Sequence, residues 1–249
     1  MTMQITRIGC APENFRKGRP SHLQIEAVVI HLIDGSQADA DATSLSTALA
    51  LKRSAHYSVS RTGEIHKYVD EQDTAFHCGI VHEPTWPGLK RGPDGQLINP
   101  NFYTIGIEHE GRVDDPWPDA MYAASAALLR DIATRYSALT PLTRRNVIMH
   151  REIRADKTCP GHMADLTRLI LEAGGPAVEQ PQVLRTRSTV NVRRGQPSTS
   201  APIVRVIPAG ELVNVRTHVT GEALNGISVW YQNMDDDYIW GGAVTILQT

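Results

Sequence analysis

The sequence predicts an α/β domain with a mixed central sheet flanked by helices, followed by a small all-β barrel. Two nearly continuous apolar runs, residues 25–33 and 104–110, are typical of strands buried on both faces. Helical patterns alternate with them, whereas short β-rich runs separated by turn signals follow residue 184. We therefore expect an α/β domain over 1–175, a linker over 176–184 and a barrel over 185–249.

Composition narrows the classes of partner. The chain has 249 residues and a formal net charge of −2, so no basic field favours nucleic acid or an anionic membrane surface. No apolar stretch is long enough for a signal-peptide core or a membrane helix. We expect a monomer that is made in the cytoplasm without a signal peptide and is not inserted in a membrane. Three cysteines, an odd number, argue against a disulfide scaffold.

The elements of the first domain follow from local patterns. Residues 1–24 are expected to be irregular, and the basic loop 15–20 within them to be a solvated turn. After the strand at 25–33, apolar spacing predicts a helix over 43–53. The runs 56–61 and 64–69 predict a β-hairpin, because Thr62-Gly63 between them favours a turn.

The second half of this domain starts with a long loop, 75–101, which contains four prolines and several glycines. After the strand at 104–110, Pro118 opens a helix with one apolar face. A short strand at 146–149 and a helix at 163–173, ended by Gly174-Gly175, complete the domain. In the tail, we expect strands at 189–192, 203–206, 212–215, 229–232 and 238–240.

Three side chains form a candidate metal site. His31 and His150 lie on or just after expected strands, and Cys159 follows nine residues after His150. Two imidazoles and one thiolate suit Zn²⁺ and leave a fourth position for water. Each signal is weak alone, since a single histidine is usually structural and a buried cysteine is usually a small hydrophobe. Spacing alone does not unite His31 with residues more than a hundred positions away.

The order of five motifs resembles that of type-2 N-acetylmuramoyl-L-alanine amidases, over roughly residues 22–175. This family includes phage amidase endolysins, muropeptide-recycling amidases and animal peptidoglycan-recognition proteins. The motifs are Val28-Val29-Ile30-His31, then Ser54-Ala55-His56-Tyr57 with Arg61-Thr62-Gly63, then Phe76-His77-Cys78-Gly79, then Asn101 through Glu108, and finally His150 through Gly161.

The resemblance implies a zinc-dependent hydrolase that cuts the amide between N-acetylmuramic acid and L-alanine in peptidoglycan. It implies that His31, His150 and Cys159 hold the zinc that activates water. Glu108 matches the family's carboxylate that moves the water's proton to the leaving amine, and Lys157 matches the lysine that stabilises the oxyanion. His77 matches a groove residue that contacts the glycan or the stem peptide.

The chain departs from the family pattern near the hairpin. One branch carries a tyrosine with a role in the reaction at the position of Ala55, and Tyr57 lies close to it in the sequence. The missing tyrosine favours the branch that relies on the carboxylate, here Glu108. Ile33 also stands where many relatives have a hydroxyl residue.

Residues 185–249 resemble bacterial SH3-like domains, on Val190 through Gly195, Pro197-Ser198-Thr199, Pro208-Ala209-Gly210, Trp230-Tyr231 and Trp240-Gly241-Gly242. The resemblance implies that this domain holds the enzyme on the cell wall, although its two tryptophans could also simply fill a barrel core. We expect an endolysin-like enzyme that lyses the wall after release or specialised export. The alternatives are a cytosolic muropeptide-recycling amidase, a non-catalytic peptidoglycan-binding protein and an exported effector.

Overall fold

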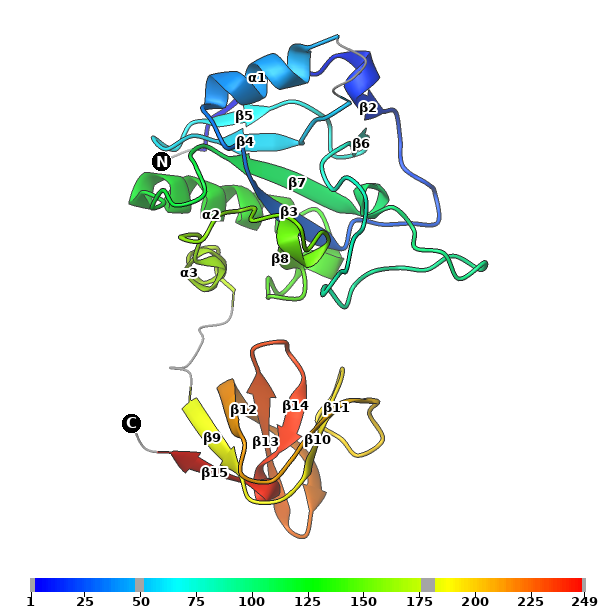
Figure 1. Cartoon of the computed structure of the whole chain (residues 1–249), viewed down its shortest axis with the longest axis vertical. Helices are drawn as coiled ribbons and strands as arrows, with labels where there is room; N and C mark the ends of the chain where they lie inside the picture. Colours follow the sequence, from blue (N-terminus) through cyan, green and yellow to red (C-terminus); the bar gives the residue numbers. More distant parts are fainter. Residues whose placement is uncertain (1–2, 48–51, 176–181, 248–249) are drawn as a thin grey trace. The chain divides into compact units, whose positions relative to one another are not determined.

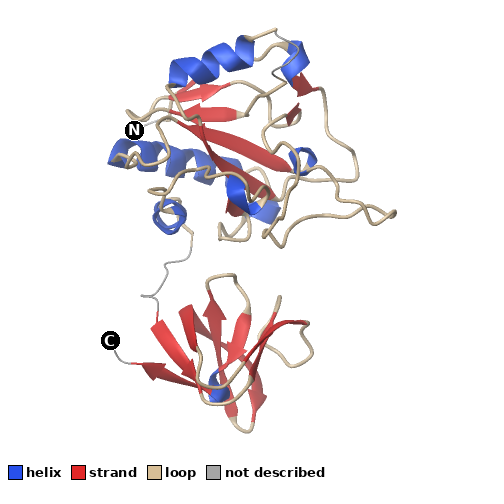
Figure 2. Cartoon of the chain, viewed as in Figure 1, coloured by secondary structure: helices blue, strands red, loops and turns tan. Residues whose placement is uncertain are grey.

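The computed structural model describes residues 3–47, 52–175 and 182–247 (Figure 1). The chain divides into two compact units, Met1–Pro176 and Ala177–Thr249. The first unit mixes helices with strands, whereas the second consists almost wholly of strands (Figure 2).

The first unit is built on a six-stranded sheet in the order β1-β5-β4-β7-β3-β8. The hairpin pair β4–β5 is antiparallel and every other neighbouring pair is parallel. The prediction of a mixed central sheet is therefore confirmed. The strands of this unit are β1 (Ile5–Arg7), β2 (Phe15–Arg16), β3 (Ala27–Leu32), β4 (Tyr57–Val59), β5 (Ile65–Lys67), β6 (Thr74–Ala75), β7 (Thr104–His109) and β8 (Val147–Met149). Its helices are α1 (Gln37–Leu45), α2 (Asp119–Ala133) and α3 (Leu166–Glu172), with 3-10 turns η1 (Pro12–Asn14), η2 (Pro100–Phe102), η3 (Ser137–Leu139) and η4 (His150–Glu152).

The two faces of the sheet have different coverings, and strand alternation separates them. On one face, Val28 and Ile30 of β3 and Ile105 and Ile107 of β7 belong to the main core, which includes buried residues of α2 and α3. The other face of β3, with Ala27 and Val29, packs against the long loop through Trp86 and Tyr103. Residues of β3 and β7 on this second face therefore point away from α2 and α3.

Helix α2 follows its predicted pattern. It begins after Pro118, as expected, and Met121, Ser125, Leu128, Leu129 and Ile132 are buried. Truncation of such fully buried apolar side chains to alanine costs about 2–5 kcal/mol each. The α2 face is thus a main source of stability for the sheet beneath it.

The prediction of a helix over 43–53 was wrong in position. Helix α1 starts at Gln37 because Ser36 and Asp39 form a capping box, and it ends at Leu45. Leu45, an apolar residue shared by the expected and the observed helix, is 53% exposed. Residues 48–51 of the expected helix lie outside the described residues.

The lead-in over residues 1–24 is less irregular than expected. Strand β1 pairs with β5 at the sheet edge, but its three residues are too few to show a period in the sequence. The basic loop is also more than a solvated turn, since Arg19 donates to the backbone oxygens of Glu71, Asn101 and Thr104 at 2.8, 2.8 and 3.0 Å. Arg19 therefore joins segments that lie far apart in the sequence.

The second unit is a seven-stranded antiparallel sheet in the order β11-β10-β14-β13-β12-β9-β15. Its strands are β9 (Gln182–Thr186), β10 (Val190–Arg193), β11 (Ile203–Ile207), β12 (Leu212–Leu224), β13 (Ile227–Asn233), β14 (Tyr238–Trp240) and β15 (Val244–Leu247), with the turn η5 (Gly241–Ala243) before β15. Strands β9 and β15 were not expected, and β9 begins inside the segment predicted as linker. The likeness to an SH3-like barrel stays a prediction.

Among the described residues, no helix is both long enough and apolar enough to span a bilayer.

Candidate metal centre

Three parallel strands bring the candidate residues to one level of the sheet. His31 on β3 is in register with Glu108 on the neighbouring strand β7. On the other side of β3, Ile30 is in register with Met149, the last residue of β8, so His150 follows at the level of His31. All three strands are parallel, and ligands of α/β sheets bind near such carboxyl ends. Successive residues of a strand point to opposite faces, so the side chains of His31, Glu108 and His150 point away from the face that α2 and α3 cover.

Cys159 reaches the same place from the loop that follows η4. Its sulfur lies 3.8 Å from Nδ1 of His31 and accepts a hydrogen bond of 3.0 Å from the backbone N–H of Leu32. The donor atoms of His31, His150 and Cys159 all lie within 4.8 Å of one another. The structure thus brings His31 together with two residues that lie more than a hundred positions away in the sequence.

The donor set fits zinc. In a tetrahedral site with bonds of about 2.0 Å to nitrogen and 2.3 Å to sulfur, neighbouring donors lie about 3.5 Å apart. The His31–Cys159 separation of 3.8 Å is close to that value. His150 Nε2 lies 3.0 Å from the backbone oxygen of Cys78, which can only accept, so Nε2 carries the proton and Nδ1 is the free donor. His31, His150 and Cys159 could therefore hold a zinc ion.

Burial controls the protonation of these groups. It lowers the pKa of His31 far below its usual range, and the closeness of two further imidazoles, His150 and His77, adds to the effect. Burial also lowers the pKa of His150. Both rings are therefore neutral, the form that binds a metal. The pKa of the Cys159 thiol is raised by burial and by the charge of Glu108, so a cation is needed to hold it as thiolate.

Glu108 provides a carboxyl group beside this centre. Burial raises its pKa to about 7. Its Oε2 atom is buried and has no hydrogen-bond partner within the described part of the chain. A carboxyl group that is half ionised near neutral pH, with one oxygen uncommitted, can both take up and release a proton. Glu108 therefore lies where an acid–base group is required.

Lys157 is exposed on the loop between η4 and Cys159. Burial has the largest effect on the pKa of His150 and of Cys159, and the positive charge of Lys157 lowers both of these pKa values. Lys157 therefore lies near enough for its charge to act on the site. The ammonium group is therefore at the rim of the centre, and its predicted role toward substrate stays a prediction.

His77 is buried behind His31, with 7% of its surface exposed. Its Nδ1 lies 3.0 Å from Nε2 of His31, and its Nε2 lies 3.3 Å from the hydroxyl of Thr104. Burial, with the nearby His150 ring and the charge of Arg19, lowers its pKa well below the usual range, so the ring is neutral. These contacts are with the candidate metal ligand, and the predicted contact with substrate stays a prediction.

Tyr57 does not belong to the centre. It lies in the main core with the residues of α2, on the opposite side of β4 from Ser58, which is in register with Glu108. Its hydroxyl donates to Oε1 of Glu71 at 2.7 Å. The structure therefore assigns Tyr57 to packing and not to catalysis.

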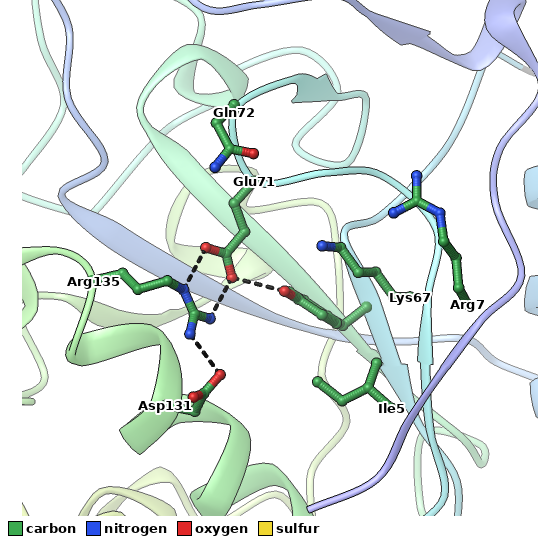
Figure 3. A pocket seen from close by; sticks show the side chains of 8 residues that line it. Ile5, Arg7, Lys67, Glu71, Gln72, Asp131 and Arg135 are labelled. Atoms are coloured by element: carbon green, nitrogen blue, oxygen red, sulfur yellow. Dashed lines mark hydrogen bonds and ion pairs between the residues drawn. The ribbon is translucent and has the colours of Figure 1, made fainter.

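A pocket of about 380 Å³ opens beside Tyr57, at the edge of the sheet (Figure 3). Its floor is the carboxylate of Glu71, which also accepts hydrogen bonds from Arg135 and from Tyr136. Arg135 in turn bonds Asp131. Because the charges of Glu71, Arg135 and Asp131 are satisfied by one another, this cluster has the character of a structural tie.

Sequence reasoning missed Thr104 and Gly106, which support the centre from β7. Thr104 contacts His77, and a side-chain Cβ at Gly106 would come within 2.5 Å of the His77 ring. The signal was present in Thr104-Ile105-Gly106-Ile107-Glu108, where small and polar residues alternate with isoleucines. On a strand, this alternation directs all three toward the same face.

Known proteins resemble the chain over its first unit. Residues 21–162 match a family model described as N-acetylmuramoyl-L-alanine amidase. The chain is 33% identical over 115 residues to "N-acetylmuramoyl-L-alanine amidase A" of Achromobacter lyticus, covering 45% of this chain and 53% of that protein. It is 34% identical over 119 residues to "1,6-anhydro-N-acetylmuramyl-L-alanine amidase AmpD" of Citrobacter freundii, covering 47% and 56%. The chain thus spans about half the length of these curated relatives.

Solved structures resemble the same fold. A crystal structure of a selenomethionine derivative of AmpD has a TM-score of 0.54 and 25% identity, covering 69% of this chain and 96% of that one. The amidase LysC from Clostridium intestinale has a TM-score of 0.51 and 15% identity, covering 70% and 100%. At that identity, the second likeness concerns the fold alone.

Proposed function

The chain belongs to the N-acetylmuramoyl-L-alanine amidase family, and from this premise we propose that it hydrolyses the amide between N-acetylmuramic acid and L-alanine in peptidoglycan, with zinc as cofactor. One observation carries the proposal: the donor atoms of His31, His150 and Cys159 lie within 4.8 Å of one another. Glu108 is in register with His31 beside them. A metal-donor set next to a buried carboxyl group is the equipment for metal-assisted hydrolysis.

Zinc held by His31, His150 and Cys159 would supply Lewis acidity to the amide carbonyl and to the attacking water. The chain's own residues prepare the site for it. Burial keeps both imidazoles neutral, and the backbone N–H of Leu32 directs a hydrogen bond at the Cys159 sulfur. Of the three donors, only the Cys159 thiol would therefore have to lose a proton for zinc to be held.

Glu108 moves the proton. Its pKa of about 7 leaves much of the carboxyl group ionised at neutral pH, so Oε2 can accept a proton from the attacking water. The protonated carboxyl then donates to the amine of L-alanine as it leaves. An ordinary exposed glutamate, with a pKa of about 4.3, would be a weaker base and would rarely be protonated.

Lys157 stabilises the charge that develops on the carbonyl oxygen. The ammonium group is exposed at the rim, where a long flexible side chain reaches a bound substrate without the cost of burial. Its charge matters most in the transition state, when the carbonyl oxygen becomes negative.

Two substrates of this class are possible, and the second unit favours the insoluble one. An enzyme that lyses the wall after its release from the cytoplasm benefits from a separate module that keeps it on the wall, and residues 182–247 form a sheet with a core of their own. The relatives named 1,6-anhydro-N-acetylmuramyl-L-alanine amidase favour the second candidate, recycling of soluble anhydromuropeptides.

Digestion of purified sacculi and of a soluble anhydromuropeptide, each with and without a chelator, tests the proposal. We expect stem peptides with a free L-alanine amino terminus, seen by mass spectrometry only when metal is present. Faster release from sacculi supports the lytic enzyme, and faster release from the soluble substrate supports recycling.

A pair of cysteine variants provides the matched control. Cys159→Ser should abolish or severely reduce release, whereas Cys10→Ser, which changes a cysteine outside the metal centre, should retain it. Full activity of Cys159→Ser in the presence of chelator would rule out the zinc mechanism. New reducing sugar ends would indicate a glycosidase, and binding without any product would indicate a peptidoglycan-binding protein.

A further inference from the structure

A chain of hydrogen bonds runs from the candidate metal ligand His31 into the core behind it. Nε2 of His31 lies 3.0 Å from Nδ1 of His77, and Nε2 of His77 lies 3.3 Å from Oγ1 of Thr104. The hydroxyl of Thr104 donates to the backbone oxygen of Pro100 at 2.8 Å. Thr104 is fully buried, so no water replaces these partners.

The last hydrogen bond of this series determines which atom carries the proton in each of the others. A hydroxyl has one proton, and Thr104 uses it on a carbonyl oxygen that can only accept. Oγ1 of Thr104 must therefore accept from His77, which places the His77 proton on Nε2. A neutral imidazole then has its lone pair on Nδ1, where it accepts from Nε2–H of His31. His31 is left with its lone pair on Nδ1, the atom 3.8 Å from the Cys159 sulfur.

The surrounding residues hold His77 in this orientation. The side-chain oxygen of Asn101 accepts hydrogen bonds from the backbone N–H groups of His77 and Cys78 at 3.2 and 2.9 Å. The ring lies against Gly106, where even a methyl group would be too close. The thiol of Cys78 lies 3.3 Å from Nδ1 of His77, but it is a weaker donor than the N–H of His31.

We propose that His77 and Thr104 are positioning residues that fix His31 in the tautomer with Nδ1 free, so that this nitrogen faces the metal. The inference rests on the zinc centre proposed above and assigns these two residues a role within it. Partners of this kind orient metal-bound histidines, and their loss typically weakens metal affinity about 10–100-fold.

The tautomer can be read directly in the unmodified protein. Long-range ¹H–¹⁵N correlation spectra of the metal-free full chain should show His31 with a protonated Nε2 and an unprotonated Nδ1. His77 should show the same pattern. A His31 ring protonated on Nδ1 would overturn the inference, without any variant that could fail to fold.

Variants of His77 test the consequence for the metal. Competition with a chromophoric chelator would measure the zinc affinity of the full chain, and circular dichroism would check that each variant is folded. His77→Leu removes the acceptor for the His31 N–H and should weaken zinc affinity about 10–100-fold. His77→Gln, whose amide oxygen can accept the same bond, should recover most of the loss. Equal affinities for wild type and both variants would overturn the inference.

Two threonine variants separate positioning from general damage. Thr104→Val removes the hydroxyl that orients His77 and should weaken zinc affinity. Thr74→Val removes another fully buried hydroxyl, one that donates to the backbone oxygen of Gly18 at 2.8 Å, and should leave zinc affinity unchanged. A wild-type chain that binds no zinc would remove the proposed function itself, whereas zinc binding that no variant weakens would remove this inference alone.

Discussion

At the scale of single residues, the centre combines side chains that have hydrogen-bond partners with one, Glu108, that has an oxygen without a partner among the described residues. His31 and His150 each use one ring nitrogen on a protein partner, which leaves the other nitrogen for a metal. Glu108, in register with His31, has an uncommitted oxygen and a pKa of about 7. Buried polar atoms are normally paired, so an exception beside a metal-donor set indicates function.

Glu108→Gln tests the carboxyl group. The amide keeps the shape of the side chain but cannot carry a proton between water and the leaving amine, so kcat should fall about 10²–10⁴-fold. Zinc content should stay at the wild-type level, because Glu108 is outside the donor set. Steady-state release of L-alanine peptides and elemental analysis of the same sample measure the two quantities. Wild-type kcat in the variant would exclude Glu108 as the acid–base group.

Sequence patterns predicted which residues come together better than they predicted the contacts around those residues. His31, His150 and Cys159 were recognisable from motif order, and the structure brings them together. The hydrogen-bond chain through His77 was not predictable, because it depends on the approach of a loop to the second face of β7. No local pattern encodes a contact between residues 77 and 104.

At the scale of elements, the buried carboxylate of Glu71 joins the hairpin strand β4 to the segment that follows helix α2. Burial alone would raise the pKa of Glu71, but hydrogen bonds from Arg135 and Tyr57 and the charge of Arg135 outweigh it, so the pKa is lowered (Figure 3). The side chain of Glu71 is 5% exposed and that of Arg135 is 38% exposed. The tie is therefore partly screened by solvent.

This tie predicts how stability depends on pH. A carboxyl group whose pKa is lower in the folded state contributes stability above its unfolded pKa of about 4.3, and the contribution is lost as pH falls through the folded pKa. The free energy of unfolding should thus decline below about pH 4.3, and less steeply in Glu71→Gln than in wild type. Urea unfolding at a series of pH values measures this. Parallel curves for both proteins would contradict it.

A substitution of the partner tests the same tie at neutral pH. Arg135→Met leaves the Glu71 carboxylate short of its main donor and should lower the free energy of unfolding by about 1–3 kcal/mol. The control is Arg7→Met, because Arg7 is 60% exposed in its pair with Asp70 and such pairs contribute about 0–1 kcal/mol. Equal decreases in the free energy of unfolding of the two variants would mean that the Glu71–Arg135 pair contributes no more than an exposed ion pair.

Helices and strands were predictable from the sequence where the hydrophobic pattern was long. Helix α2 and strands β3 and β7 were expected near their observed positions, because burial imposes a continuous period on them. Strands β1, β9 and β15 were missed, since each has only three to five residues and gains its structure from a partner strand. The position predicted for helix α1 was wrong because the prediction relied on apolar spacing. The capping box at Ser36 determines where this helix begins.

At the scale of the whole molecule, the chain carries two units with separate cores. The family match lies in the first unit, and the candidate metal centre lies there too. The second unit contributes none of the candidate site residues. Its proposed role is therefore binding to the wall and not chemistry.

Removal of the second unit tests this division of labour. A chain that ends at residue 175 should hydrolyse a soluble muropeptide at close to the wild-type rate, since the centre and its core are intact. It should sediment less with sacculi, because the unit with the proposed wall-binding role is gone. Unchanged sedimentation would remove the binding role of the second unit and leave the amidase proposal in place.

The central claim is that three distant side chains form one zinc site, and X-ray absorption at the zinc edge of the purified full chain tests it most directly. The account predicts one zinc per chain, with one sulfur at about 2.3 Å and nitrogen or oxygen donors at about 2.0 Å. The sulfur should vanish from the zinc shell in Cys159→Ser and remain in Cys10→Ser. A shell without sulfur in the wild-type protein, or zinc that binds equally well without His31, His150 and Cys159, would contradict the account.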